Sequence, residues 1–445
     1  MNENQRLESL LEALSSEQFD RVRALLSELH PAETADLLES LPPKARVKIW
    51  DLIEPEFEGD VLAHTQDAVR ADLLEHMQPQ EVAEATKDLE TDDAADILQD
   101  LPEELVGSVL LSMDAQNRER VASILSYHED TAGGLMNIDV IPVRADVTLD
   151  VVSRYLRQLG EIPGQTDSLI VIDRQNKYLG LLSLANLLTR KHAATVGETM
   201  TTEAGISADM SAHDVAKLFE QRDLISVPVI DHEGKLLGRI TVDDVLDVIQ
   251  EEAGHTVLSM AGLGEDDLFA PVLSSAKRRA VWLGINLLTA FLASWVIGRF
   301  EDTIQQLVAL AVLMPIVASM GGIAGSQTLT LSIRGLALGQ INKNNSRSLM
   351  FKELAVGAFN GLIWACVVAI IAWLWFKDIS LGVILGLAMI INLVVAALAG
   401  ALIPLTLKRI GVDPAIAGGV LLTTVTDVVG FMTFLGLATL FLLPG

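Results

Sequence analysis

The sequence predicts a multi-domain membrane protein with an all-α N-terminal domain, an α/β domain and a C-terminal transmembrane domain of five helices. Three observations predict this fold class. Five apolar segments, each long enough to cross a bilayer, follow one another in the C-terminal part. Two internal repeats divide the preceding part into a helical and a strand-containing region. Residues 1–276 carry 53 acidic and 21 basic side chains, whereas residues 277–445 carry 6 and 11.

Residues 1–130 have the pattern of short amphipathic helices separated by prolines, with hardly any strand signal. The segment 33–42 recurs as the segment 93–102, and a degraded copy surrounds Met77. Units of this kind bury their leucines by stacking as helical hairpins. We therefore expect an acidic superhelical domain over residues 1–130. Its charge would repel phosphates, which argues against a nucleic-acid partner and favours divalent cations.

Short β-rich runs alternate with helices after residue 136, and the segment 173–186 recurs as the segment 231–244. Each copy predicts a strand (169–172 and 227–230), a turn, a second strand and a helix. The pattern resembles a tandem pair of CBS motifs, which implies an α/β domain over residues 131–252. CBS pairs often bind adenine nucleotides such as ATP, and the resemblance places Thr241 and Asp244 at the ribose. A pair that only dimerises is an equal alternative.

A connecting helix is expected over residues 253–276, with Gly262 and Gly264 marking flexibility, and the transmembrane domain over residues 277–445. Nine basic residues, Lys343 among them, flank the spans on one side, and only Arg299 and Lys377 flank the other. By the positive-inside rule the N-terminal domains are cytoplasmic and the C-terminus is outside the plasma (inner) membrane. The expected spans are 281–298, 304–333, 354–376, 379–407 and 414–445.

The last span carries a single charge, Asp427. A carboxylate at the bilayer centre costs several kcal/mol or more unless it faces water or a cation. A salt bridge within the membrane is disfavoured because the central regions of the spans contain no Lys or Arg. We therefore expect a cation path. The second span contains Pro315 and three glycines, which interrupt a helix and are tolerated only against protein or a water-filled cavity. Close helix packing is the alternative.

Three motifs carry a more specific resemblance: the run from Pro315 to Gln327, the Asp413-Pro414-Ala415 entry to the last span, and Thr423-Thr-x-x-Asp427-x-x-Gly430. They resemble the MgtE family of magnesium channels, and the order of domains extends the resemblance over nearly the whole chain. It implies a homodimer in the lipid bilayer that carries hydrated Mg2+ through a pore on its two-fold axis. Asp427 would be the metal ligand of the pore. The other implied pore-lining residues are Pro315, Gly321, Gly322, Gly325, Gln327, Asp413, Thr423 and Thr424.

Two acidic stripes suggest how the pore is gated. Asp88, Asp92, Asp96 and Asp100 recur at every fourth position, and Asp244, Asp247 and Glu251 form a second stripe, followed by Glu252. Like charges on such ridges repel, so Mg2+ that bridges two domains would draw them together and close the pore. A solvated helix face is the alternative for either ridge. The resemblance implies regulatory magnesium ligands at Asp92, Asp96, Asp223, Asp244, Asp247 and Glu252, and the stripe adds Glu251.

Two departures from the family pattern and two competing functions remain. Ile323 stands where much of the family has Asn, and Gly254-His255-Thr256 stands where further carboxylates are common, so selectivity and magnesium inhibition can differ. A transporter of Co2+, Mn2+ or Zn2+ is disfavoured because the spans contain no His and only Cys366. A membrane-anchored nucleotide or metal sensor needs neither the broken second span nor the charged fifth. No motif of an enzyme or an ATP-driven pump is found, and coupling to another ion stays open.

Overall fold

The computed structural model describes residues 10, 12–13, 16, 18–263, 272–342 and 344–442, so Gly264 and Lys343 lie outside the described residues. The chain divides into two units, residues 1–253 and 254–445.

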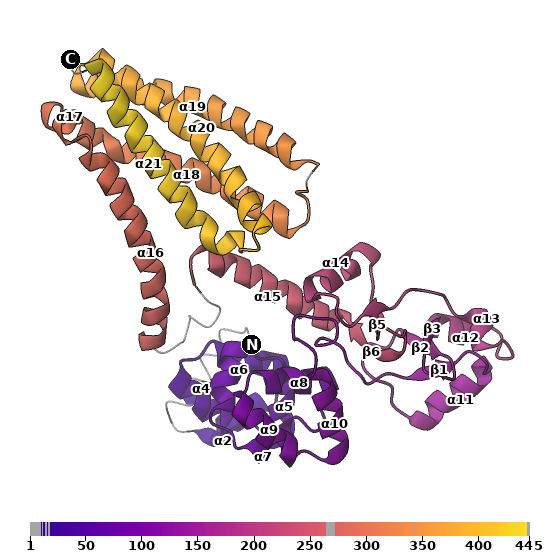
Figure 1. The fold of residues 1–445 in the computed structure, drawn as a ribbon. Helices are drawn as coiled ribbons and strands as arrows, with labels where there is room; N and C mark the ends of the chain where they lie inside the picture. The colour runs from indigo at the N-terminus through magenta and orange to yellow at the C-terminus, as the bar shows by residue number, and fades with distance from the viewer. Residues whose placement is uncertain are drawn as a thin grey trace. The chain divides into compact units, whose positions relative to one another are not determined.

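The first part of unit one is a stack of short helices (Figure 1). From α3 onward the helices begin at a constant interval, at positions 31, 43, 55, 67, 79, 91, 103 and 115, and proline occupies the first turn of α3, α4, α5 and α7. Proline suits this position because its missing N–H has no intrahelical partner there. The helices are α2 (Phe19–Leu26), α3 (Pro31–Glu39), α4 (Pro43–Trp50), α5 (Pro55–Ala63), α6 (Asp67–Leu74), α7 (Pro79–Ala85), α8 (Thr91–Gln99), α9 (Glu103–Ser112) and α10 (Ala115–Ile124).

The core of this stack repeats with the same interval. Leu38, Leu62, Leu74 and Leu98 are at most 1% exposed, and each is the eighth residue of its helix. The helices of the stack are too short to be stable alone, so packing has to hold them. Alternate helices supply it: α3 packs on α5, α5 on α7, and α7 on α9. The helical domain predicted for this region is confirmed.

Two three-stranded sheets follow, and they have one topology. In each sheet the first strand is parallel to the second, and the second is antiparallel to the third. Asn176 and Gly234 occupy equivalent turns of the two repeats, with φ of 64° and 81°. The tandem α/β repeat is thereby confirmed. The elements are β1 (Pro142–Arg144), α11 (Leu149–Leu159), β2 (Ser168–Ile172), β3 (Tyr178–Ser183), α12 (Leu184–Thr189), α13 (Val196–Thr199), β4 (Ile206–Ser207), α14 (Ala212–Arg222), β5 (Ser226–Ile230), β6 (Leu236–Thr241) and α15 (Val242–Met260).

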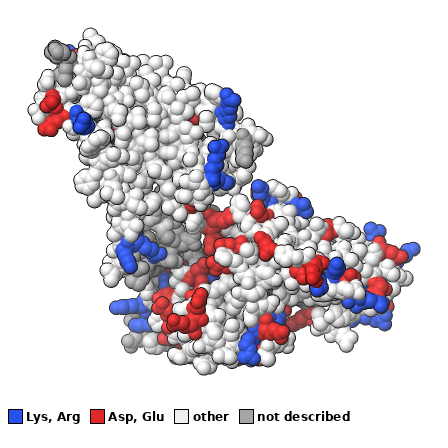
Figure 2. All heavy atoms as spheres, in the orientation of Figure 1, with Lys and Arg blue, Asp and Glu red and all other residues white. Residues whose placement is uncertain are grey.

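Within the described residues, the membrane unit contains five helices that are long and apolar enough to cross a bilayer. Helix α20 packs against α18, α19 and α21, and α16 packs against α21 (Figure 1). The exposed face of this unit in Figure 2 is almost free of charge, and the charged side chains lie at its ends. The helices are α16 (Val272–Gly298), the short α17 (Glu301–Gln306), α18 (Ala309–Ala337), α19 (Ser346–Phe376), α20 (Ile379–Arg409) and α21 (Pro414–Leu442).

Three expected spans differ from the structure, and the first of them starts earlier than expected, because α16 begins at Val272 rather than at 281. The second is not a single helix from residue 304, because Leu307 leaves the helical conformation (φ −133°, ψ 79°) between α17 and α18. Helix α18 then runs without a break through Pro315 and the glycines. Pro315 deprives only one carbonyl of its helical donor. Helix α19 starts at Ser346 rather than 354, which brings Glu353 inside the helix.

Candidate functional site

Asp427 lies in the middle of α21, a helix that begins directly after Asp413. The Asp413 carboxylate accepts a hydrogen bond of 2.8 Å from the backbone N–H of Ala415, so it caps the helix. Asp427 is half-buried, and its carboxylate has neither an ion pair nor a hydrogen bond within the described residues. A lone carboxylate in an apolar helix is stable only with water or a cation. The geometry therefore leaves Asp427 available to a cation.

Three threonines surround Asp427 on the same helix. The Thr423 hydroxyl donates to the Gly419 carbonyl (2.9 Å), Thr424 donates to Val420 (2.7 Å), and Thr426 donates to Thr423 (3.1 Å). A hydroxyl whose proton is used in this way offers only lone pairs to other groups. This part of α21 therefore accepts hydrogen bonds, as the waters around a hydrated cation require.

The three glycines between Pro315 and Gln327 lie on two faces of α18. Gly321 and Gly325 are buried, and a Cβ at either position would overlap the Asn392 amide of α20 or Leu422 of α21. Gly322 has open space beside it, and Ile323 is 56% exposed. The exposed Pro315 and Gln327 also lie on the outside of the single chain. Close packing thus accounts for two of the three glycines and leaves Gly322 facing outward.

The sequence reasoning missed two polar side chains in the membrane unit. Glu353 is 3% exposed; its carboxylate accepts a hydrogen bond from Thr328 of α18 (3.0 Å) and lies 3.2 Å from the Lys352 ammonium. Asn392 of α20 is fully buried. Asn392 interrupts an apolar stretch of the sequence, and Glu353 stands at the edge of one, next to Lys352. A polar residue in such a place is the signal that could have found it.

In unit one, acids of α8 and α15 face each other. Burial raises the pKa of Asp92 well above its ordinary value, and Asp244 of α15 raises it further. Burial also raises the pKa of Asp96 to about 8 and that of Asp244 to about 7. Burial and then Glu90 raise the pKa of Asp93 to about 6. Two helices from different domains therefore bring carboxylates together at a junction where each is costly to ionise.

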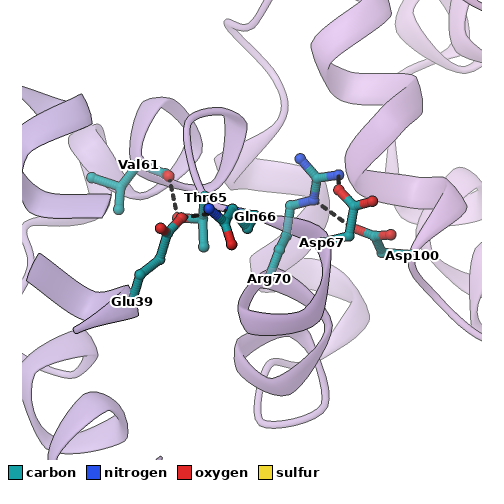
Figure 3. A network of polar contacts seen from close by, with 7 residues as sticks. All are labelled: Glu39, Val61, Thr65, Gln66, Asp67, Arg70 and Asp100. Atoms are coloured by element: carbon teal, nitrogen blue, oxygen red, sulfur yellow. Dashed lines mark hydrogen bonds and ion pairs between the residues drawn. The ribbon is translucent and has the colours of Figure 1, made fainter. Parts of the chain in front are cut away.

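The prediction that four acids share one helix is wrong for Asp88, which lies before α8, and Asp100 lies just after the last residue of α8. Helix α8 begins only at Thr91, so Asp88 lies in the bend that precedes it. Asp100 follows the last turn of α8 and bonds Arg70, which also lies 2.7 Å from Asp67 (Figure 3). Asp92 and Asp96 are the members of the ridge that lie within α8.

The other predicted regulatory acids have different surroundings. Asp247 is exposed on α15, and partial burial of its carboxyl group together with the charge of Asp243 raises its pKa. Glu251 is exposed one turn further along. The Glu252 carboxylate lies 2.9 Å from Nδ1 of His213, and Asp223 caps the end of α14 with φ 51°. The structure thus groups Asp247 with the acids of α8 and engages Glu252 with a histidine.

No group of three or more His, Cys, Asp and Glu side chains among the described residues is placed to hold a metal ion as it stands. One oxygen nevertheless fits such a role. Oδ1 of Asp92 is buried and accepts no hydrogen bond in the part of the chain that the structure describes. Buried polar atoms normally have partners, so this oxygen is suited to a cation ligand.

The two candidate nucleotide-binding residues are joined to each other. The Thr241 hydroxyl lies 3.0 Å from the Asp244 carboxylate, and the Thr241 backbone N–H donates to that carboxylate over 2.9 Å. In the first repeat, Ser183 accepts a bond of 3.2 Å from the backbone N–H of Asn186. The second repeat therefore presents a carboxylate where the first presents an amide.

Comparisons with known proteins match all three regions. A family model described as a divalent cation transporter, MgtE, matches residues 314–437, the MgtE intracellular N domain matches residues 29–130, and CBS domains match residues 132–193 and 196–251. The chain is 32% identical to the magnesium transporter MgtE of Thermus thermophilus over 98% of both chains. It is 30% identical to the magnesium transporter MgtE of Bacillus subtilis over 94% of both. A crystal structure of the cytosolic domain of the Mg2+ channel MgtE in complex with ATP is 31% identical, with a TM-score of 0.50, and covers 54% of this chain and 99% of that one.

Proposed function

The chain belongs to the MgtE family of divalent cation transporters, and we propose that it carries Mg2+ across the membrane along a path that includes Asp427. The observation that carries the proposal is the Asp427 carboxylate, which has no protein partner among the described residues. The nearby hydroxyls of Thr423 and Thr424 already donate to backbone carbonyls, so they can only accept hydrogen bonds from a bound group. Mg2+ keeps several of its waters and is usually held by one or two carboxylates. Co2+ and Zn2+ favour nitrogen or sulfur ligands, and the sequence contains no His after His255.

Flux into liposomes that contain only this protein tests the assignment. Mg2+ uptake is measured for the wild type, Asp427→Asn, Asp427→Ala and a control, Asp378→Asn. Asp378 is the matched control because its carboxylate caps α20 through Ser380 (2.8 Å) at the end of a helix, away from Asp427 in sequence. We expect about a tenfold or larger loss for both Asp427 variants, because losing about 1.4 kcal/mol or more of stabilisation of the passing cation lowers the rate by that factor. Equal uptake by wild type and Asp427→Ala would reject the role of this residue, and parallel runs with Co2+, Mn2+ and Ca2+ rank the ions.

We propose that two copies form the pore, with the C-terminus outside the plasma membrane. The outward positions of Gly322, Ile323 and Gln327 on α18 support a second copy at this face. Ile323→Cys in a Cys366→Ser background should cross-link between copies in the membrane. Leu374→Cys on α19, which is 53% exposed, is the control. Equal cross-linking of the two variants would argue against a pore at the α18 face.

We propose that Asp92, Asp96, Asp244, Asp247 and Glu251 hold regulatory Mg2+ at the α8–α15 junction. The raised pKa values and the unpartnered Oδ1 of Asp92 support this assignment. A divalent cation would neutralise the charges that repel there. Inhibition of uptake by Mg2+ on the cytosolic side should weaken in Asp92→Asn. Unchanged inhibition would argue that these acids do not regulate the pore.

The roles of Asp223 and Glu252 as further regulatory ligands remain proposals, and so does nucleotide binding at Thr241 and Asp244. The related cytosolic domain crystallised with ATP supports the nucleotide. Titration of the full chain with ATP should give a binding isotherm that Thr241→Ala weakens. Equal affinity of the two proteins would remove Thr241 from the site.

A further inference from the structure

A buried amide links the two helices that carry the candidate cation path. Asn392 lies on α20, is fully buried, and donates a hydrogen bond of 2.8 Å from its Nδ2 to the backbone carbonyl of Val317 on α18. Asn392 is the only amide side chain between residues 379 and 407. Interhelical hydrogen bonds from such side chains are a principal means of holding membrane helices together.

The same amide touches α21 through a glycine. A Cβ placed on Gly430 would lie 2.8 Å from Nδ2 of Asn392 and 3.2 Å from Cγ1 of Val317. Real Cβ atoms are not found that close, so the α21 backbone rests directly on the amide. Gly430 is three residues after Asp427, and residues three apart lie on one side of a helix. The position of the Asp427 turn is thus set by a contact with Asn392.

The oxygen of the same amide adds a further observation. Oδ1 of Asn392 is buried and accepts no hydrogen bond from any described residue. Leaving a buried acceptor unsatisfied is unfavourable, and an apolar side chain of the same shape would avoid that cost. A requirement for packing alone would therefore be met as well by leucine. The chain has an amide at a position where its unpaired oxygen is unfavourable for stability, which points to a role other than stability.

We infer that Asn392 is a positioning residue for transport: through Val317 and Gly430 it fixes the Asp427 turn of α21 against α18. This inference rests on the proposed Mg2+ transport and adds a residue to it. Gly430→Ala should push α21 away from the amide, whereas truncation of Asn392 should make room for the added methyl group. Gly436→Ala is the matched control on α21, because a Cβ there would meet no atom closer than 4.0 Å.

The experiment measures Mg2+ uptake into liposomes over a range of external Mg2+, together with the thermal midpoint of each purified protein. We expect Gly430→Ala to lower the maximal rate about tenfold, less than the loss of about a hundredfold that a displacement of about 1 Å can cause at a reacting group. Gly436→Ala should keep the wild-type rate. The double variant Gly430→Ala/Asn392→Ala should be no slower than Asn392→Ala alone, because the added methyl group then meets no amide. Asn392→Leu should also transport slowly although its thermal midpoint equals or exceeds that of the wild type.

Each outcome decides the inference. Wild-type rates in Gly430→Ala or in Asn392→Leu would overturn it, and so would a double variant clearly slower than Asn392→Ala alone. A slow Asn392→Leu with a lowered midpoint would also overturn it, because the role would then be structural. Absence of uptake by the wild type itself would instead refute the proposed transport function on which the inference rests.

Discussion

The acidic junction between α8 and α15 makes a quantitative prediction about pH. The pKa of Asp96 is raised from 3.8 to about 8, chiefly by burial. A carboxyl group whose pKa is raised by folding binds its proton more tightly in the folded state, so stability is lost as pH rises from the ordinary value through the raised one. At pH 7 the ionisable Asp96 therefore costs about 4 kcal/mol, since pH 7 lies about three units above the ordinary pKa and one unit corresponds to about 1.4 kcal/mol.

The substitution Asp96→Asn removes this cost while preserving the shape of the side chain. We expect the variant to gain stability at pH 7 and to lose much of the pH dependence between pH 5 and pH 8. Mg2+ should stabilise the wild type most at high pH, by about 2.7 kcal/mol at a hundredfold excess over its dissociation constant, and should stabilise the variant less.

The assay is protease resistance and thermal unfolding of the full chain in detergent, at pH 5 to 8, with chelator or with Mg2+. The control is Asp36→Asn, because Asp36 is exposed and is the sixth residue of α3, as Asp96 is of α8. Wild-type stability that does not fall between pH 5 and pH 8 without divalent cations would refute the reasoning. So would an equal response of the two variants.

Three further substitutions test the packing and capping described above. Leu98→Ala should destabilise the helical stack by about 2–5 kcal/mol, measured by urea unfolding, because Leu98 is fully buried; a loss below about 1 kcal/mol would contradict this. Glu353→Ala should lower the thermal midpoint more than Glu353→Gln, since the amide can still accept the Thr328 hydrogen bond; equal midpoints would contradict it. Asp413→Ala should cost about 1 kcal/mol through loss of the α21 cap, and an unchanged midpoint would argue against capping.

The strands of the CBS pair were predictable because the duplicated segments repeat an apolar run, a turn and a second run. The structure places β2 and β5 at the predicted positions, each at the same place in its copy. The helical repeat was predictable only in part. Its constant step is obscured because Asp67, Thr91, Glu103 and Ala115 begin helices where other members begin with proline. The recurrence of the segment 33–42 at 93–102 therefore revealed only every fifth step.

The candidate sites divide in the same way. Asp427 is visible in the sequence because a charge in an apolar run costs free energy wherever the neighbours lie. Asn392 and Glu353 have hydrogen-bond partners on another helix, and Asp92 and Asp244 also lie on different helices. Such contacts depend on how the helices pack on one another, and the periodicity of a single segment does not predict that packing. The unbroken α18 has the same origin, because α20 and α21 pack along its glycines.

Because the N-terminal helices begin at a constant interval, the number of helices sets the spacing between positions in this domain. The helices from α3 to α10 all advance along the sequence by the same increment, and α8, which carries Asp92 and Asp96, is the sixth of them. Inserting or deleting one step between α8 and α15 would keep the eighth residue of each helix in phase while changing the length of chain that connects α8 to α15. Related chains could thus move the acidic helix in whole increments without redesigning the core. The number of helices between α8 and α15, rather than any single contact, then decides whether the carboxylates of these two helices can meet.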